Sequence, residues 1–133
     1  MRSEMETDSR VVIYPEQDWT EKTLKGAFAV HNAIGCGFLE KVYSSALLVE
    51  LRQMGLGCEQ EVPFKIRFKE AVICDYCADL VVARRVIVEL KACAALEGVH
   101  EAQILNYLKA SGVRVGLLMN FGKPKLQYRR FIV

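Results

Sequence analysis

The chain has 133 residues, of which 52% are hydrophobic, and this is enough to form the core of one domain. Lys and Arg together number 18 and Asp and Glu 16, so the net charge is only +2. This balance neither favours nor excludes binding to nucleic acid, because a nucleic-acid surface on such a chain has to come from local clustering of basic side chains.

No stretch of the chain approaches the roughly 20 apolar residues that a membrane helix needs. The start of the sequence is polar and acidic, whereas a secretory signal has an apolar core. We therefore expect a cytoplasmic protein without a membrane partner.

The five cysteines are predicted to be reduced thiols, because their number is odd and the chain shows no sign of export. Cys74 and Cys77 form a C-x-x-C pair, whose functional interpretation is half of a metal or redox site. Side chains at this spacing point to opposite faces of a regular strand, and no second C-x-x-C completes a zinc site. We therefore interpret the pair as two small residues of a strand.

The N-terminal third is predicted to be a tail followed by two helices. Residues 1–17 are expected to form a flexible tail, whose apolar run 11–14 either adds an edge strand or packs on the surface. Apolar residues at helical spacing predict helices over 20–34 and 39–54. The glycines of the segment 35–37 mark the break between them.

After this point the apolar period changes from that of a helix to that of a strand. Residues 62–68 alternate between apolar and polar, which predicts a strand with one wet face, and Lys69-Glu70 is predicted to be a turn. Two mostly apolar strands at 71–83 and 86–92, a helix at 98–110, and strands at 113–121 and 126–133 are expected to follow. This order predicts an α/β fold with a mixed central sheet flanked by helices, in which residues 18–133 form a single domain.

Charged residues interrupt two of these apolar strands. Asp79 lies in the run YCADLVV, and Glu89 and Lys91 lie in VIVELKA. Burial of a charge costs free energy unless the charge is paired or bound to a metal. Glu89 and Lys91 are two residues apart and therefore project from the same face of their strand.

The turn between these two strands decides whether Asp79 faces Glu89. A two-residue turn at Arg84-Arg85 would place Asp79 opposite Leu90, so that its side chain faces away from Glu89. A turn centred on Arg85 with an odd number of loop residues, or an equivalent bulge, aligns the two carboxylates. We favour the odd loop, because the turn lacks the Gly or Asn of a tight two-residue hairpin.

Two carboxylates from adjacent strands can hold a hard cation such as Mg²⁺. The cation polarises a phosphodiester and lowers the pKa of a bound water, and a nearby ammonium orients that water or stabilises charge on the phosphate. Asp79, Glu89 and Lys91 match these needs. The alternative is a buried ion pair with an Asp at a strand end, and these residues alone leave both interpretations open.

The spacing of these residues resembles the D…(D/E)-x-K signature of the PD-(D/E)XK nuclease superfamily, with nine residues between Asp79 and Glu89-x-Lys91. More narrowly, the chain resembles the GxxExxY family of small proteins assigned to that superfamily, with Gly37, Glu40 and Tyr43 in GFLEKVY. The stretches VIVELKA, HEAQILNYLKASG and GLLMNFG also match in order, so the resemblance covers about residues 20–133. One departure is Ala78, where the superfamily name has Pro.

The resemblance implies a restriction-endonuclease-like core and a role for each matching residue. Asp79 and Glu89 would bind Mg²⁺ or Mn²⁺, with Glu40 near the metal, and Lys91 would position the attacking water or contact the phosphate. Gln103 and Tyr107 resemble the Q-x-x-x-Y element of RecB-like nucleases, and at four residues apart they share one face of a helix.

Several of these residues have a simpler structural interpretation. Glu40 can cap a helix at the surface, since carboxylates favour helix starts. Tyr43 is interpreted as a core residue with a bonded hydroxyl, and Gln103 and Tyr107 can form a buried hydrogen-bonded pair. A basic bias in the C-terminal third is either a phosphate-contacting face or solvated charge, and it comprises Lys109, Arg114, Lys123, Lys125, Arg129 and Arg130.

The function that we expect is that of a metal-dependent nuclease or phosphodiesterase that hydrolyses nucleic acid, with DNA preferred over RNA. The alternative is a non-catalytic module that binds nucleic acid or protein on a nuclease-like fold. A third option is a homodimer that associates through the apolar strand 113–121. If the carboxylates of Asp79 and Glu89 lie too far apart to share one ion, the hypothesis of a metal-dependent enzyme is excluded.

Overall fold

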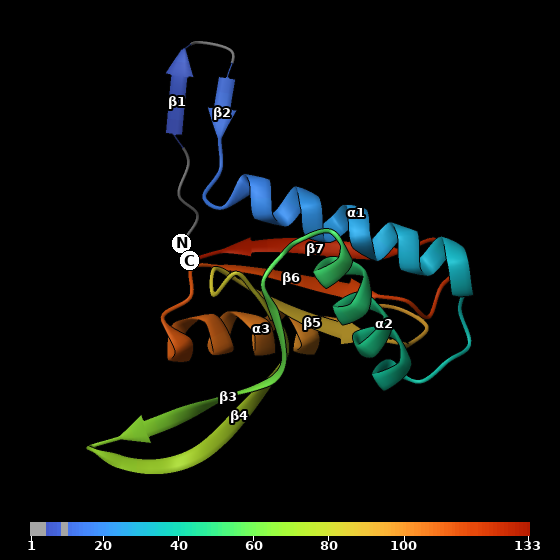
Figure 1. Ribbon diagram of the computed structural model, residues 1–133. Helices are drawn as coiled ribbons and strands as arrows, with labels where there is room; N and C mark the ends of the chain where they lie inside the picture. The colour runs from blue at the N-terminus through green and yellow to red at the C-terminus, as the bar shows by residue number, and fades with distance from the viewer. Residues whose placement is uncertain (1–4, 9–10) are drawn as a thin grey trace.

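The computed structural model describes the backbone of residues 5–8 and 11–133, and the side chains from Tyr14 onward except that of Cys74. Three helices and seven strands lie in this part of the chain (Figure 1). Their order is β1 (Met5–Asp8), β2 (Val11–Ile13), α1 (Gln17–Ile34), α2 (Glu40–Gln53), β3 (Cys58–Phe68), β4 (Ala71–Val82), β5 (Val86–Lys91), α3 (Gly98–Ser111), β6 (Val115–Asn120) and β7 (Gln127–Ile132). From α1 onward this is the predicted order of elements.

Five strands form the main sheet, in the order β3-β4-β5-β6-β7. The pair β5 and β6 is parallel, because α3 connects them across one face of the sheet, and the other neighbours are antiparallel. The predicted α/β architecture with a mixed central sheet is confirmed.

The helices cover opposite faces of the sheet. Residues of α1 and α2 pack with Val86, Val88 and Leu90 of β5 in one apolar cluster. Residues of α3 pack with Ile87 of the same strand in a second cluster. Because Glu89 and Lys91 share the strand face of Ile87, they belong to the face that α3 covers.

The N-terminal segment differs from the prediction at two points. β1 and β2 pair with each other, with Met5 opposite Ile13, so the apolar run forms a separate two-stranded sheet and adds no strand to the main one. Helix α1 begins at Gln17, three residues before the expected start at Thr20. Thr20 lies inside the helix, where its hydroxyl donates to the carbonyl of Gln17 at 2.9 Å. The flexibility of residues 1–17 stays a prediction.

The apolar strand proposed for a dimer interface lies inside the sheet. β6 pairs with β5 on one side and with β7 on the other, and every one of its residues is buried. Its apolar side chains, such as Leu117 and Leu118, fill the two clusters under the helices. The expectation that 113–121 forms the surface of a homodimer is therefore wrong, because neighbouring elements of the same chain already cover this strand.

Candidate active site

The turn between β4 and β5 brings the predicted site together. Three residues, 83–85, separate the paired residues Val82 and Val86, so the loop is odd as predicted but is centred on Arg84, one residue before the predicted centre. Ala83 and Arg84 adopt φ values of 53° and 57°, which let the chain reverse without a Gly or Asn. The last pair is Leu80 with Val88, and the next step along this register places Asp79 beside Glu89.

The carboxylates of Asp79 and Glu89 are close neighbours. Oδ2 of Asp79 accepts a hydrogen bond from the backbone N–H of Leu90 at 2.8 Å, which ties β4 to β5 just beyond their ladder. Glu89 is 9% exposed. Its burial raises the pKa of its carboxyl to about 8, and the charge of Asp79, together with a hydrogen bond between the two side chains, raises this pKa further. The two groups are therefore near enough to share one ion.

Tyr76 is a site residue that the sequence interpretation missed. Its hydroxyl donates a hydrogen bond to Oε1 of Glu89, and its ring is 7% exposed. Burial first, and then the charge of Glu89, raise the pKa of Tyr76 far above its ordinary value, so its proton stays in place to donate. The signal available in the sequence is a hydrogen-bonding aromatic residue in an apolar strand, three positions before Asp79.

A rotation of β4 allows Tyr76 and Asp79 to reach the same carboxylate. Residues three apart on a regular strand point to opposite faces. However, Ala78 packs in the α3 cluster, whereas Leu80, which has the same parity, packs in the α1–α2 cluster. The change falls at Asp79, which lies between the strand pairs Gln60–Leu80 and Val62–Ala78, and there Glu61 of β3 has a φ of 54°.

Helix α3 adds Tyr107 to this group. The ring of Tyr107 stacks on the ring of Tyr76 with centroids 3.4 Å apart and an interplanar angle of 14°. Gln103, one turn earlier on α3, is exposed. The interpretation of Gln103 and Tyr107 as a buried pair is therefore wrong, because only Tyr107 packs into the site.

Lys91 ends β5 on the strand face of Glu89, and its side chain is half-buried. Within the described residues its ammonium makes no ion pair or hydrogen bond. The backbone after it is held by Asn120, whose side chain bonds the N–H of Cys93 at 3.0 Å and the carbonyl of Cys93 at 2.9 Å. A Cβ on Gly122 would lie 2.5 Å from the same backbone N and O atoms, so this close approach requires glycine.

Glu40 and Tyr43 have different environments from those of the carboxylates. Glu40 is the exposed first residue of α2, and across the described residues it makes no hydrogen bond or ion pair with Asp79 or Glu89. Tyr43 is fully buried, and its hydroxyl donates to the carbonyl of Gly35 at 2.6 Å and accepts from the N–H of Phe38 at 3.2 Å. The interpretation of Tyr43 as a core residue with a bonded hydroxyl is confirmed.

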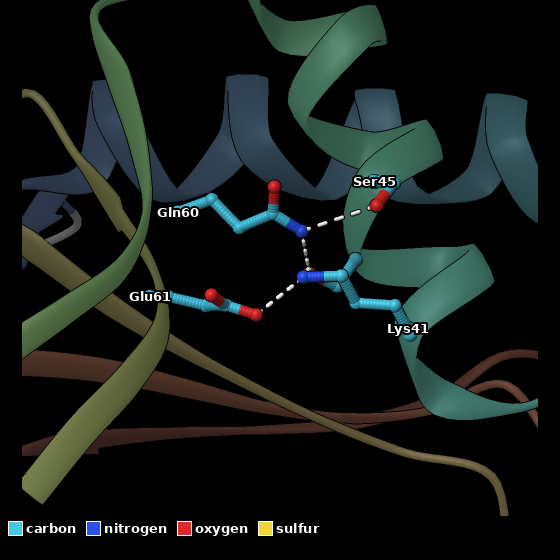
Figure 2. A network of polar contacts seen from close by, with 5 residues as sticks. Lys41, Ser45, Gln60 and Glu61 are labelled. Carbon is cyan, nitrogen blue, oxygen red and sulfur yellow. Dashed lines mark hydrogen bonds and ion pairs between the residues drawn. The ribbon is translucent and has the colours of Figure 1, made fainter.

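A polar network connects the start of α2 to β3 (Figure 2). Lys41 forms an ion pair with Glu61, and the Nε2 group of Gln60 donates to the hydroxyl oxygens of Ser44 at 2.7 Å and Ser45 at 3.2 Å. These contacts join the helix that carries Glu40 to the part of β3 that lies alongside Asp79. Glu40 is therefore on an element fixed near the site, although it is not bonded to the carboxylates.

The two carboxylates suit a cation that retains part of its hydration shell when it binds. In the described part of the chain, no group of three or more His, Cys, Asp or Glu side chains is arranged to hold a metal ion. Mg²⁺ commonly takes one or two carboxylates and completes its coordination with water and substrate phosphate. Asp79 and Glu89 fit this pattern, and a cation would stabilise the ionised form of Glu89 against the burial and the Asp79 charge that raise its pKa.

Comparison with known proteins agrees with this fold. The chain belongs to the PD-(D/E)XK nuclease superfamily, whose model matches residues 17–131. Among solved structures, the one titled "Crystal structure of SSO0001" has 18% sequence identity and a TM-score of 0.56, over 88% of this chain and 58% of that chain. This likeness shows the fold, and the chain spans little more than half of that relative's length. No curated protein matches.

The expected PD-(D/E)XK core is therefore confirmed. The superfamily groups nucleases, so a nuclease-like domain is established for this chain, and nucleases of this kind generally use divalent metals. None of the helices in the described residues is long and apolar enough to cross a membrane.

Proposed function

We propose that the protein is a metal-dependent nuclease that hydrolyses phosphodiester bonds in nucleic acid, with Asp79 and Glu89 as ligands of Mg²⁺ or Mn²⁺. The observation that carries the proposal is the convergence of the two carboxylates at the end of the β4–β5 ladder, where Glu89 is buried beside a like charge. A buried carboxylate beside a second, half-buried one costs stability, and a bound cation offsets this cost.

Each residue of the candidate site has a separate role in the proposed reaction. When bound, the metal polarises the phosphodiester and lowers the pKa of a water. Lys91 orients that water or stabilises charge on the phosphate. Tyr76 fixes the orientation of the Glu89 carboxylate, and Tyr107 fixes the ring of Tyr76 by stacking. We assign Gln103 and Glu40 to the rim, where an exposed amide and an exposed carboxylate meet substrate and hydrated metal.

The finer assignments are proposals as well. We place the chain in the GxxExxY branch on the residues Gly37, Glu40 and Tyr43, with DNA preferred over RNA and a cytoplasmic location. The bonds from Tyr43 to Gly35 and Phe38 give two members of this motif a reason to occur together, since the tyrosine closes the loop in which the glycine lies.

The test is hydrolysis of end-labelled DNA and RNA, single- and double-stranded, with Mg²⁺ or Mn²⁺. Asp79→Asn and Glu89→Gln should each lower the rate by at least about 10³-fold, and Lys91→Ala by about 10²–10³-fold. Glu59→Gln is the matched control, because it removes an exposed carboxylate from the neighbouring strand and should leave the rate unchanged. Cleavage by Glu89→Gln at the rate of the unmodified protein would disprove the proposal.

A non-catalytic binding module is the second candidate, and one observation favours it. Each carboxylate already has a donor inside the protein, since Asp79 accepts from Leu90 N–H and Glu89 accepts from Tyr76. A purely structural pair would need nothing more. Binding of nucleic acid that is the same in Glu89→Gln and the unmodified protein, without hydrolysis in either, would establish this second function.

A further inference from the structure

The hairpin of β3 and β4 continues beyond the main sheet. The described pairs between β4 and β5 end at Leu80, whereas β3 and β4 remain paired from Val62 and Ala78 to the turn. This two-stranded part, residues 62–78, is called the ribbon here, and it curves away from the body of the molecule (Figure 1). The ribbon begins next to Asp79 and contains Tyr76, so it extends directly from the carboxylates.

The outer part of the ribbon does not pack on the rest of the chain. Near its base, Val62, Phe64 and Ile66 pack against the α3 cluster. All residues of 67–73 are exposed, including the large apolar side chains of Phe68 at 60% and Ile73 at 62%. Apolar side chains gathered on an uncovered tip are typical of an interaction surface.

The tip is also basic in a chain whose total charge is nearly balanced. Residues 65–73 contain Lys65, Arg67 and Lys69 against the single acid Glu70. Lys65 lies opposite Asp75 across the two strands, and Glu70 offsets one of the two remaining cations, so the ribbon as a whole carries a net charge of +1. Arg67 and Lys69 are exposed near the turn, where their charges can reach phosphate groups.

We propose that the ribbon docks in the major groove of duplex DNA, with Arg67 and Lys69 on phosphates, and so brings one strand of the duplex to Asp79 and Glu89. The major groove of B-DNA is about 12 Å wide and admits a two-stranded β-ribbon. The eight steps from Ala71 to Asp79 extend roughly 26 Å at about 3.3 Å each, enough to cross the groove and still reach the site. The reaction at the site rests on the proposed function, but the docking does not.

The shape of the groove selects DNA over RNA. The major groove of A-form RNA is deep and narrow and does not admit side chains, so a ribbon has no place in it. The exposed apolar side chains of the tip match the thymine methyl groups that line the groove of DNA. The occupant is therefore duplex DNA.

Binding is measured by fluorescence anisotropy with a labelled DNA duplex in EDTA, so that no hydrolysis occurs. The double variant Arg67→Gln and Lys69→Gln should bind at least about tenfold more weakly, and its plot of log affinity against log salt should be shallower by about 1.8, the value for two lost phosphate contacts. The matched control is the double variant Lys22→Gln and Lys25→Gln on α1, which also removes two exposed cations. Lys22 lies over the ring of Trp19, as Lys69 lies over the ring of Phe68. This control variant should bind as the unmodified protein does.

Three results would overturn the inference: equal weakening in both double variants, no weakening in either, or equal binding of duplex RNA and duplex DNA of one sequence by the unmodified protein. A tip that instead binds a second copy of the chain would appear as a dimer lost on substitution of Arg67 and Lys69, with DNA binding unchanged. Hydrolysis is assayed separately with Mn²⁺. Duplex binding that depends on the ribbon, without any cleavage, would contradict the nuclease proposal and leave the docking intact.

Discussion

The two faces of the sheet are built on different principles. The face under α1 and α2 is closed largely by apolar side chains, and the buried hydroxyl of Tyr43 on this face has hydrogen-bond partners. The face under α3 buries Glu89 beside Asp79, which raises the pKa of Glu89 to about 8. Both faces belong to the same short strand β5, whose alternate residues point to one or the other.

This difference separates stability from function within one small domain. A folded chain gains nothing from a buried carboxylate beside a second, half-buried one, because the two charges repel each other and burial of a charge costs free energy. Apolar packing stabilises both faces, but on the α3 face the carboxylate pair offsets part of this stabilisation. Truncation of a core residue on the first face and removal of the Glu89 charge on the second should therefore change the free energy of unfolding in opposite directions.

On the α1–α2 face, Leu47→Ala should lower the free energy of unfolding by about 4 kcal/mol, because Leu47 is fully buried and the substitution leaves a cavity. The loss should be the same at pH 5 and pH 8, since no ionisable group is involved. Urea titration measures it. Val49→Ala on the exposed side of the same helix is the control and should change stability by less than about 0.5 kcal/mol.

On the α3 face, Glu89→Gln should raise the free energy of unfolding by about 3 kcal/mol at pH 8. The pKa of Glu89 is higher in the folded protein than in the unfolded chain, so its contribution to stability is complete below about pH 4.5 and is lost as the pH rises to about 8. Gln mimics the neutral form, and the difference between the two proteins should therefore vanish at pH 4. A difference that is constant with pH would contradict the buried-carboxylate account.

Tyr76→Phe should lower the free energy of unfolding by about 1–2 kcal/mol, because the buried carboxyl of Glu89 loses its donor. The hydrogen bond from Tyr76 lowers the pKa of Glu89, so the substitution should also raise that pKa and shift the pH dependence of stability upward. Tyr128→Phe on the exposed side of β7 should change neither quantity. Identical pH profiles for the two variants would show that Tyr76 is only a packing residue.

The smallest effect is expected at the ribbon turn. Lys69 and Glu70 have φ values of 48° and 70°, a conformation that favours glycine over residues with a side chain. Glu70→Gly should therefore raise the free energy of unfolding by about 1 kcal/mol. Ala71→Gly, next to the turn in β4, is the control and should lower it by about 0.5–1 kcal/mol.

Much of this arrangement is predictable from the sequence because local periodicity determines it. The order of elements from α1 onward, the turn at Lys69-Glu70 and the odd loop before β5 follow from apolar spacing and turn chemistry. The alignment of Asp79 with Glu89 then follows from counting residues around that loop.

The features that the sequence missed depend on tertiary structure. Tyr76 reaches Glu89 only because β4 rotates at Asp79, so that its alternate side chains exchange faces there. In a regular strand, Tyr76 would face away from Asp79 and Glu89. The role of Gly122 depends on a close backbone approach to Cys93, a residue far from it in sequence. Helix α1 begins before the expected Thr20, at a position where Glu16 has a left-handed backbone and makes no capping hydrogen bond, so the sequence carries no usual start signal there.

The most direct test of the central claim is calorimetric titration of Mg²⁺ and Mn²⁺ into the unmodified protein, Asp79→Asn and Glu89→Gln at pH 6 and pH 8. We predict binding to the unmodified protein that is lost in both variants. Its affinity should fall by about tenfold for each pH unit below 8, because the metal must displace the proton from Glu89. Binding that survives in Glu89→Gln, or that is the same at both pH values, would contradict the assignment of the metal to these carboxylates.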